Sequence, residues 1–276
     1  MTAPQYPDHI AIKQCRNGPM MYFRNDRYIG KLLDQYGEFA ERELGVLRGL
    51  VEPGDIVLDV GANIGTYTIP LAQMVGPSGL VLAFEPMRQV FNVLCANIAM
   101  SGAINILAQQ RAIGRTSGVA KMPLLDTAAP ENNYGVSTFE EEGATVSVIP
   151  VDSCGLKRCD FIKIDVEGME ADVLAGARQT IETFRPILWV ENDRPDKSAN
   201  LIFTLHEMDY RAFWHFAPLL PDAAAGTPDV PPHMVGVLSM DMLCFHKDLD
   251  ANMTGFIEAI PGDTCDAALH RYEKVA

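Results

Sequence analysis

Residues 58–69 read LDVGANIGTYTI, and they continue an apolar, β-branched run that begins two residues earlier. Every second position carries a small or polar residue: Asp59, Gly61, Asn63 and Gly65. A buried strand that turns through glycines into a helix is typical of the ligand-binding edge of an open parallel sheet. The stretch therefore predicts an α/β fold with a ligand at this turn.

The spacing of the small residues narrows the choice of ligand. A dinucleotide-binding loop needs glycines at its first, third and sixth positions, but counting from Gly61 the chain has Asn63 and Thr66. A phosphate-binding P-loop is excluded because its Lys-Ser/Thr pair is missing. The turn favours a ligand without a pyrophosphate, such as S-adenosylmethionine, whose ammonium suits a carboxylate such as Asp59. Glu85, near the end of the next predicted strand, is placed to accept from the ribose hydroxyls of the ligand. Because NAD is bound by an acid in the same place, Glu85 alone does not distinguish the two cofactors.

Apolar strands and helical stretches alternate as far as residue 192. Strands are predicted at 56–61, 80–86, 105–114, 161–168 and 187–192, and helices at 66–76, 87–101 and 169–184. Two later strands, 210–216 and 236–247, suggest a closing hairpin. We therefore predict a seven-stranded, mostly parallel α/β sheet with a final antiparallel hairpin and helices on both faces.

The flanking segments divide the chain further. Residues 1–50 should form an irregular arm and a helix at 38–51 that packs on the core, and 251–276 a tail with a short helix. The main domain, 51–250, has two insertions. Extra strands are expected near 115–150, and the five prolines of 217–236 indicate a loop of the kind that often forms a lid.

Composition limits the partners of the protein. A net charge of −14 without a basic cluster argues against nucleic acid. The start, MTAPQYPDHI, lacks the features of a signal peptide, and no apolar run is long enough to span a membrane. We expect no membrane partner, a cytoplasmic location and six reduced, scattered cysteines. The sequence is compatible with a homo-oligomer and does not specify the oligomeric state.

Several stretches together resemble the FkbM-type S-adenosylmethionine-dependent methyltransferases, a Rossmann-like branch of class I. The matching stretches are DVGANIGTYT (59–68), FEP (84–86), RAIG (111–114), FIKIDVEGME (161–170) and VEN (190–192), with RNDRYIGKLLDQYGEF (24–39) and MDMLCF (240–245). The resemblance implies cofactor binding by Gly61, Asn63, Gly65 and Glu85, with Ala112 and Ile113 near the adenine. The full predicted cofactor set adds Tyr36, Glu38, Asp59, Tyr67, Pro86 and Asp165.

Polar side chains end the fourth and fifth predicted strands: Asp165, Glu167, Glu191 and Asn192. Ligands of open parallel sheets lie at these strand ends, so we place Asp165 near the cofactor and Glu167 or Glu191 near the methyl acceptor. There a carboxylate would take the proton of a hydroxyl. Glu167 has an alternative role as a cap of the following helix. Lys163 shares strand parity with Asp165 and is its expected partner.

The sequence contains other candidates for a metal site and for contacts with the acceptor. The same carboxylates suit magnesium, but their spacing does not demand a metal and none is predicted. His215, close to the proline-rich loop, is a catalytic candidate on the acceptor side, whereas His206 should pack on a helix. Tyr134, in the first insertion, would stack on a ring of the acceptor or belong to a simple turn.

The sequence thus predicts an S-adenosylmethionine-dependent methyltransferase acting on a hydroxyl of a small or medium molecule, of sugar or secondary-metabolite type. The alternatives are N-methylation of a peptide or amine, a nucleotide-linked oxidoreductase, and a non-catalytic module that binds the cofactor. The acceptor itself is not specified by these residues.

Overall fold

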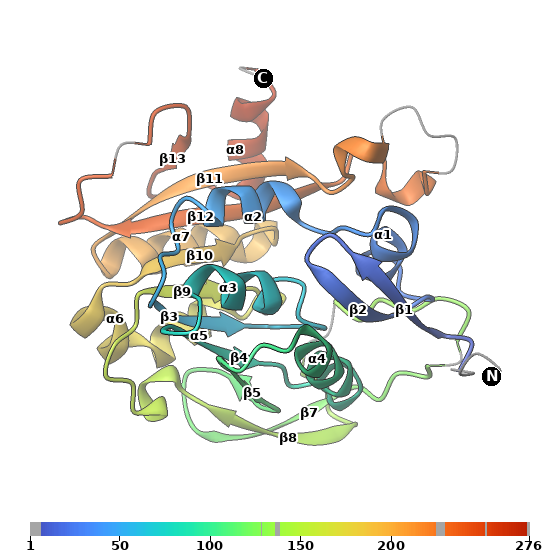
Figure 1. The fold of residues 1–276 in the computed structure, drawn as a ribbon. Helices are drawn as coiled ribbons and strands as arrows, with labels where there is room; N and C mark the ends of the chain where they lie inside the picture. The colour runs from blue at the N-terminus through green and yellow to red at the C-terminus, as the bar shows by residue number, and fades with distance from the viewer. Residues whose placement is uncertain (1–6, 128, 136–138, 225–229, 252, 275–276) are drawn as a thin grey trace.

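The computed structural model describes residues 7–127, 129–135, 139–224, 230–251 and 253–274. Its main sheet contains, in chain order, β3 (Ile56–Val60), β4 (Leu80–Phe84), β5 (Ile106–Gln109), β9 (Phe161–Ile164), β10 (Ile187–Glu191), β11 (Tyr210–Pro218), β12 (Leu238–His246) and β13 (Ile257–Ala259). In space the order is β13-β11-β12-β10-β9-β3-β4-β5 (Figure 1). The first predicted strand thus lies in the middle of the sheet.

The sheet has eight strands, so the predicted count of seven is wrong. Strands β5, β4, β3, β9 and β10 are parallel, while β12 runs antiparallel to both β10 and β11, as the predicted closing hairpin requires. The additional strand, β13, comes from the tail and pairs antiparallel with β11. It satisfies backbone groups that β11 would otherwise expose at the edge of the sheet.

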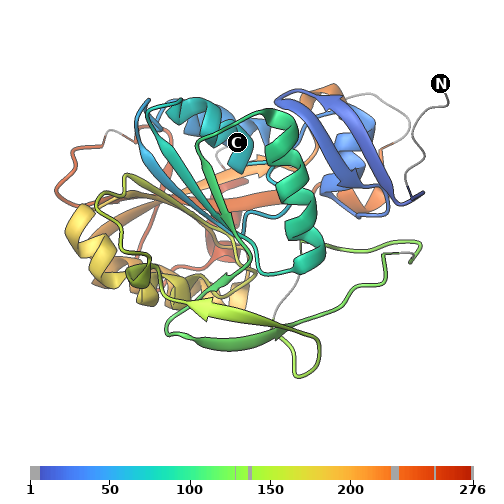
Figure 2. The same cartoon turned by 60° about the horizontal axis from the view of Figure 1, so that its bottom comes forward.

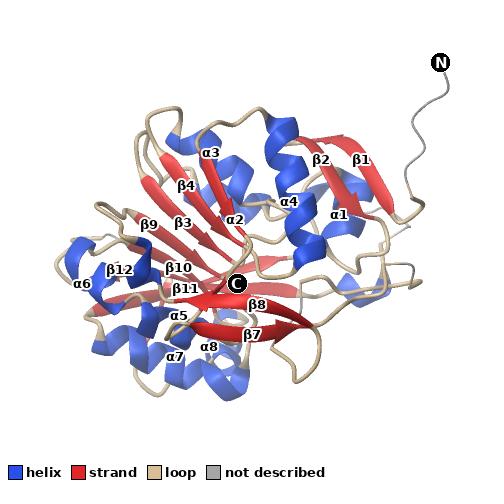
Figure 3. Ribbon diagram, turned by 90° about the horizontal axis from the view of Figure 1, so that it is seen from below, coloured by secondary structure: helices blue, strands red, loops and turns tan. Residues whose placement is uncertain are grey.

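Helices cover both faces of this sheet, as predicted (Figure 3). One face carries α2 (Glu41–Leu47), α3 (Thr68–Val75) and α4 (Arg88–Ser101). The other carries α5 (Glu170–Gly176), α6 (Arg178–Phe184), α7 (Pro195–Glu207) and α8 (Cys265–Tyr272). The predicted helix at 169–184 is divided in two at Ala177. Among the described residues, no helix has the length and apolar character needed to cross a membrane.

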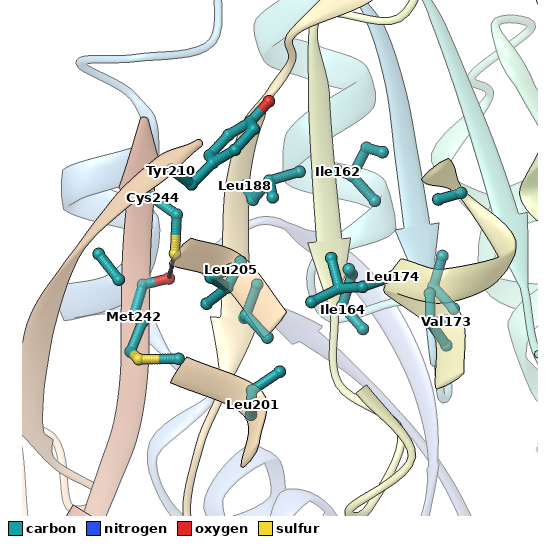
Figure 4. Close-up of a cluster of buried hydrophobic side chains, with 14 of the residues drawn as sticks. Ile162, Ile164, Val173, Leu174, Leu188, Leu201, Leu205, Tyr210, Met242 and Cys244 are labelled. Carbon is teal, nitrogen blue, oxygen red and sulfur yellow. Dashed lines mark hydrogen bonds between the residues drawn. The ribbon is translucent and has the colours of Figure 1, made fainter. Parts of the chain in front are cut away.

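Strand parity decides which side chains reach which face. Ile162, Ile164 and Leu188 point toward α5 and α7, where they pack against residues such as Leu174 and Leu205 (Figure 4). Burying one such aliphatic side chain stabilises the fold by about 1.5 to 3 kcal/mol. The alternate residues of the same strands face α2 and α3, and this is the face on which the polar residues of the sheet gather.

The N-terminal arm is regular, contrary to the prediction. It forms a hairpin of β1 (Ile10–Cys15) and β2 (Gly18–Phe23), followed by α1 (Ile29–Tyr36). The turn of the hairpin is Arg16-Asn17, and Gly18, which follows it as the first residue of β2, has a φ of 122°. A short polar turn followed by glycine between two strand-like stretches is a hairpin signal, which the predicted irregular arm did not take into account.

The insertion near 115–150 forms extra strands, as predicted. β6 (Ala112–Ile113), β7 (Gly118–Met122) and β8 (Ala144–Ile149) make a small sheet beside the main one (Figure 2), and a 3₁₀ turn, η1 (Val151–Cys154), follows. The single strand predicted at 105–114 is wrong, because its two halves join different sheets. Between them Arg111 N donates to Gln109 O at 2.9 Å, which turns the chain sharply.

The proline-rich loop packs against the rest of the fold. Its described part contains two 3₁₀ turns, η2 (Asp222–Ala224) and η3 (Pro232–Met234). The guanidinium of Arg42 on α2 donates to Pro218 O at 2.8 Å and Leu220 O at 2.7 Å, and it also pairs with Asp222. These contacts attach the start of the loop to α2.

Candidate active site

A cavity of about 630 Å³ opens at the carboxyl ends of β3, β4, β9 and β10, under α2 and the proline-rich loop. This is the expected position for a ligand of an open parallel sheet, and the volume suits a small-molecule site. The predicted cofactor residues that line it are Glu38, Gly61, Asn63, Tyr67, Glu85, Pro86, Ala112, Ile113 and Asp165. Tyr36, Asp59 and Gly65 lie outside its lining.

The glycines of the opening stretch serve the packing of the loop. Gly61 has a φ of 82°, and a Cβ there would lie 1.7 Å from the carbonyl oxygen of Asp165. Gly65 has a φ of 94°, and a Cβ there would lie 2.9 Å from Cδ1 of Leu94 on α4. The bare backbone thus lets the neighbouring strand and helix approach, in addition to leaving room in the cavity at Gly61.

Replacing Gly61 by alanine should therefore destabilise the whole fold. Gly102 is the matched control, because its φ of 69° and ψ of 7° are left-handed and an added Cβ would meet nothing within 4 Å. The control variant suffers only the strain of positive φ, about 1 to 2 kcal/mol. Gly61→Ala should lose a further amount of about 1 to 3 kcal/mol for the clash with the Asp165 carbonyl. Urea unfolding of both variants measures the difference, and equal stabilities would contradict this contact.

Glu85 is fixed at the end of β4 by backbone donors of the glycine loop. One carboxylate oxygen accepts from Asn63 N at 3.0 Å and the other from Met87 N at 2.8 Å. The residue is 7% exposed and lines the cavity, and burial raises its pKa to about 7. Each oxygen keeps a further lone pair for a ligand hydroxyl.

Lys163 links the glycine loop to the end of β9. Its ammonium lies 3.1 Å from Asp165 Oδ2 and 3.6 Å from Asp59 Oδ1, and it donates to Gly61 O at 3.2 Å. The predicted pairing of Lys163 with Asp165 is confirmed. The ring of Tyr67 lies 4.8 Å from the same ammonium, close enough for a cation–π contact.

Asp59 is fully buried behind this lysine. It accepts a hydrogen bond from the hydroxyl of Thr68 at 2.6 Å, and burial raises its pKa. From this position it does not offer an oxygen to a ligand in the cavity. Its effect on a ligand passes through Lys163 and the loop, so the direct contact expected from the sequence is replaced by a structural role.

Glu167 faces the cavity and does not cap the following helix. Its backbone has a φ of 58°, and its carboxylate pairs with Arg194, which also holds Asp193 at 2.7 Å. Burial and the neighbouring Asp165 raise the pKa of Glu167 to about 8. The N-cap of α5 is Met169, without a side-chain cap hydrogen bond, while Glu170 in the first turn accepts from the preceding loop, from Val166 N at 3.2 Å and Gly168 N at 2.8 Å.

Glu191 is the least neutralised of the predicted carboxylates. Among the described residues, no hydrogen-bond partner reaches its buried Oε2. Burial, followed by the charges of Asp165 and Asp193, raises its pKa well above the ordinary value. One oxygen each of Asp165, Glu167 and Glu191 lies within 4.8 Å of the others, so the group has the ligand chemistry for a divalent cation.

The remaining candidates lie outside the cavity or are engaged elsewhere. His215 is not among the residues that line the cavity. Its ring packs 5.1 Å from the ring of Trp189, and burial lowers its pKa to about 4. His206 lies 3.2 Å from Ala259 O, in a packing role. Tyr134 lines the cavity, but its ring stacks on Phe23 at 4.0 Å.

The structure adds side chains that the sequence analysis missed. Asp241 on β12 is opposite both Glu191 and His215 in the sheet, and it accepts from Trp189 Nε1 at 3.0 Å and from the Ser239 hydroxyl. Glu43 on α2 is 4% exposed and lines the same end of the cavity. The alternation of Ser239 and Asp241 in an otherwise apolar strand was the available signal.

A family model and several curated proteins match this sequence. A family model described as the methyltransferase FkbM domain matches residues 59–212, more than half of the 276 residues. The match begins at Asp59 in β3 and ends in β11, so it contains the glycine loop, Glu85 and the carboxylates at the ends of β9 and β10, but not Tyr36 or Glu38.

Three curated proteins illustrate the similarity. A methyltransferase sdnD from Sordaria araneosa is 25% identical, over 47% of this chain and 66% of its own length. A 31-O-demethyl-FK506 methyltransferase FkbM from Streptomyces tacrolimicus is 28% identical, over 46% and 60%. A hexuronic acid methyltransferase AglP from Haloferax volcanii is 29% identical, over 51% and 59%. The chain thus spans less than two thirds of each of these relatives.

Proposed function

The chain belongs to the FkbM methyltransferase family, and from that premise we propose that it transfers a methyl group from S-adenosylmethionine to a hydroxyl of a small or medium molecule. The observation that carries the proposal is the position of Glu191. This side chain is half-buried and lines the same cavity as the glycine loop and Glu85, and because no described donor reaches its buried Oε2, the carboxylate is less neutralised than those of Asp165 and Glu167.

The cavity residues fit the proposed cofactor. Glu85 has the lone pairs and the position for the two ribose hydroxyls, beside Asn63 of the loop. Ala112 and Ile113 offer an apolar wall for the adenine. The carboxylate-rich strand ends suit a ligand that carries both an ammonium and a sulfonium charge. When bound, S-adenosylmethionine supplies the methyl group on its positively charged sulfur.

The residues of the chain then act on the acceptor. Glu191 accepts the hydroxyl proton while the oxygen–carbon bond forms and the carbon–sulfur bond breaks, which leaves a neutral thioether and a protonated carboxyl. A raised pKa makes Glu191 a stronger base than an ordinary glutamate. Lys163 keeps Asp165 in place, and Arg194 does the same for Glu167. The proline-rich loop helps to exclude water, since Leu219 and Pro221 line the cavity.

Two further points concern a divalent cation and the class of acceptor. The carboxylates of Asp165, Glu167 and Glu191 would be the ligands of a divalent cation if one were required, but Lys163 and Arg194 already neutralise two of them. We therefore assign no step to a metal. The names of the Streptomyces and Haloferax relatives support transfer to oxygen-rich acceptors, and the loop sequence at Asn63 and Thr66 continues to disfavour a nicotinamide cofactor.

Calorimetric titration with S-adenosylhomocysteine tests the proposed cofactor. We expect micromolar binding by the wild-type protein and a loss of about 10- to 100-fold in Glu85→Gln, because a charged hydrogen-bond acceptor for the ribose is removed. Glu182→Gln is the control, since Glu182 lies exposed on α6 and pairs with the exposed Arg178. No detectable binding to the wild type would contradict the proposal, and binding of NADH instead would favour the oxidoreductase.

A further inference from the structure

The acceptor end of the cavity contains a second group of polar residues, separate from the carboxylates of β9 and β10. It consists of Glu43 on α2 with Ser239 and Asp241 on β12, and we call it the α2–β12 group. All three side chains line the cavity, and the two acids are only 4% and 6% exposed. Chemically, the group presents several oxygen acceptors and a single hydroxyl.

Within the α2–β12 group, each oxygen of Asp241 accepts one hydrogen bond and keeps a second lone pair. The Ser239 hydroxyl has one proton, which it donates to Asp241, although Glu43 also lies within its reach. Trp189 Nε1 supplies Asp241 with one further donor at 3.0 Å. Burial and then Glu43 raise the pKa of Asp241 to about 8. The remaining lone pairs can accept from a hydrogen-bond donor of a ligand in the cavity that these residues line.

The nearby cations are already engaged. Lys163 holds Asp59 and Asp165, and Arg194 holds Glu167 and Asp193. Arg42, on the same helix as Glu43, is bound to the proline-rich loop. An anionic substituent at this end of the cavity would therefore meet carboxylates without a free counter-charge from these three residues.

We propose that the α2–β12 group binds a second hydrogen-bond donor of the methyl acceptor, which is therefore a neutral or cationic polyol or amino alcohol. The inference rests on the proposed function, because it takes Glu191 to receive the proton of the hydroxyl that is methylated. One donor then lies at Glu191 on β10, and another at Asp241 on the neighbouring strand β12. Leu238, Met240 and the loop residue Leu219 flank the group and give the acceptor an apolar contact.

Four probes built on a six-membered ring test this class on protein saturated with S-adenosylhomocysteine. They are methyl glucopyranoside, its 2-amino analogue, its uronic acid analogue, and cyclohexylmethanol, which has one hydroxyl and no second donor. The dissociation constants of the amino sugar and the neutral sugar, measured by saturation-transfer NMR, should be at least about tenfold lower than that of cyclohexylmethanol, because two of their donors are satisfied at once. The uronic acid should bind most weakly.

Substitutions in the α2–β12 group separate recognition from folding. Asp241→Asn keeps an oxygen for Trp189 but cannot ionise, so at a pH above the raised pKa of Asp241 it should reduce the preference for the amino sugar by about tenfold without changing the affinity for cyclohexylmethanol. Glu43→Gln should weaken the exclusion of the uronic acid. It serves as the second variant if Asp241→Asn fails to fold. Glu182→Gln, on the exposed surface of α6, should leave all four constants unchanged.

Three results would overturn the inference. The first is a uronic acid that binds as tightly as the neutral sugar, and the second is an equal loss for all four probes in both variants. The third is the failure of both sugars with two donors to bind. In each case S-adenosylhomocysteine binding decides separately whether the proposed function survives.

Discussion

Replacing Glu191 by glutamine should lower kcat for methyl transfer by about 10²- to 10⁴-fold, because the base that receives the hydroxyl proton is removed. The pKa of Glu191 is raised by burial, so its ionised form grows as the pH rises. In the wild type kcat should increase with pH through this raised pKa, whereas Glu191→Gln should show no such increase. Both are measured as S-adenosylhomocysteine released from an acceptor that supports turnover.

The amide variant keeps the shape of the side chain, so its affinity for S-adenosylhomocysteine should equal that of the wild type. Glu182→Gln again provides a surface control for general effects of a lost charge. A glutamine variant with wild-type kcat would show that another group takes the proton, and the remaining candidates would be Asp165 and Glu167, which also line the cavity.

Replacing Lys163 by methionine should have the largest effect on stability, a loss of about 3 to 5 kcal/mol, because it leaves buried carboxylates without their cation. Asp59 is 0% exposed, and Lys163 is its paired cation at 3.6 Å. Since part of this cost can be relieved by protonating Asp59, urea unfolding should show a smaller loss at pH 5 than at pH 8.

The direction of this pH dependence follows from the raised pKa of Asp59. Burial raises it in the folded protein, and without Lys163 it rises further. An acid whose folded pKa exceeds its unfolded value of about 4 favours folding fully below that value and loses this contribution as the pH rises through the folded pKa. Lys157→Met, on an exposed residue, should change stability by less than about 0.5 kcal/mol. An equal loss in the two variants would contradict the role of Lys163.

The central strands could be predicted from sequence because their residues carry the information locally. β3, β4, β9 and β10 are mostly apolar, as in strands buried on both faces, with Asp59 and Lys163 as the charged residues inside β3 and β9, and the helices between them have their own period. β13 and the N-terminal hairpin were missed for a different reason. They are short, and their strand character depends on the strand that each one pairs with, β11 for β13 and β2 for β1.

The two ends of the site also differ in how far they could be predicted from the sequence. The cofactor end is formed largely by consecutive stretches after β3, β4 and β9, so its residues could be identified from motifs. The acceptor end joins Glu43 on α2 to Asp241 on β12 and to Glu191 on β10, which are far apart along the chain. Only the register of β10 against β12 brings Glu191 opposite Asp241, and no local pattern encodes that pairing.

The direct test of the central claim is the fate of the methyl group itself. S-adenosylmethionine with a deuterated methyl group is incubated with a pool of small polyols and amino alcohols, and the products are analysed by mass spectrometry. We predict that the wild-type protein places the label on an acceptor oxygen, and that Glu191→Gln, with unchanged cofactor affinity, does so far more slowly. Tight binding of the cofactor without label in any product, or equal labelling by both proteins, would contradict this account.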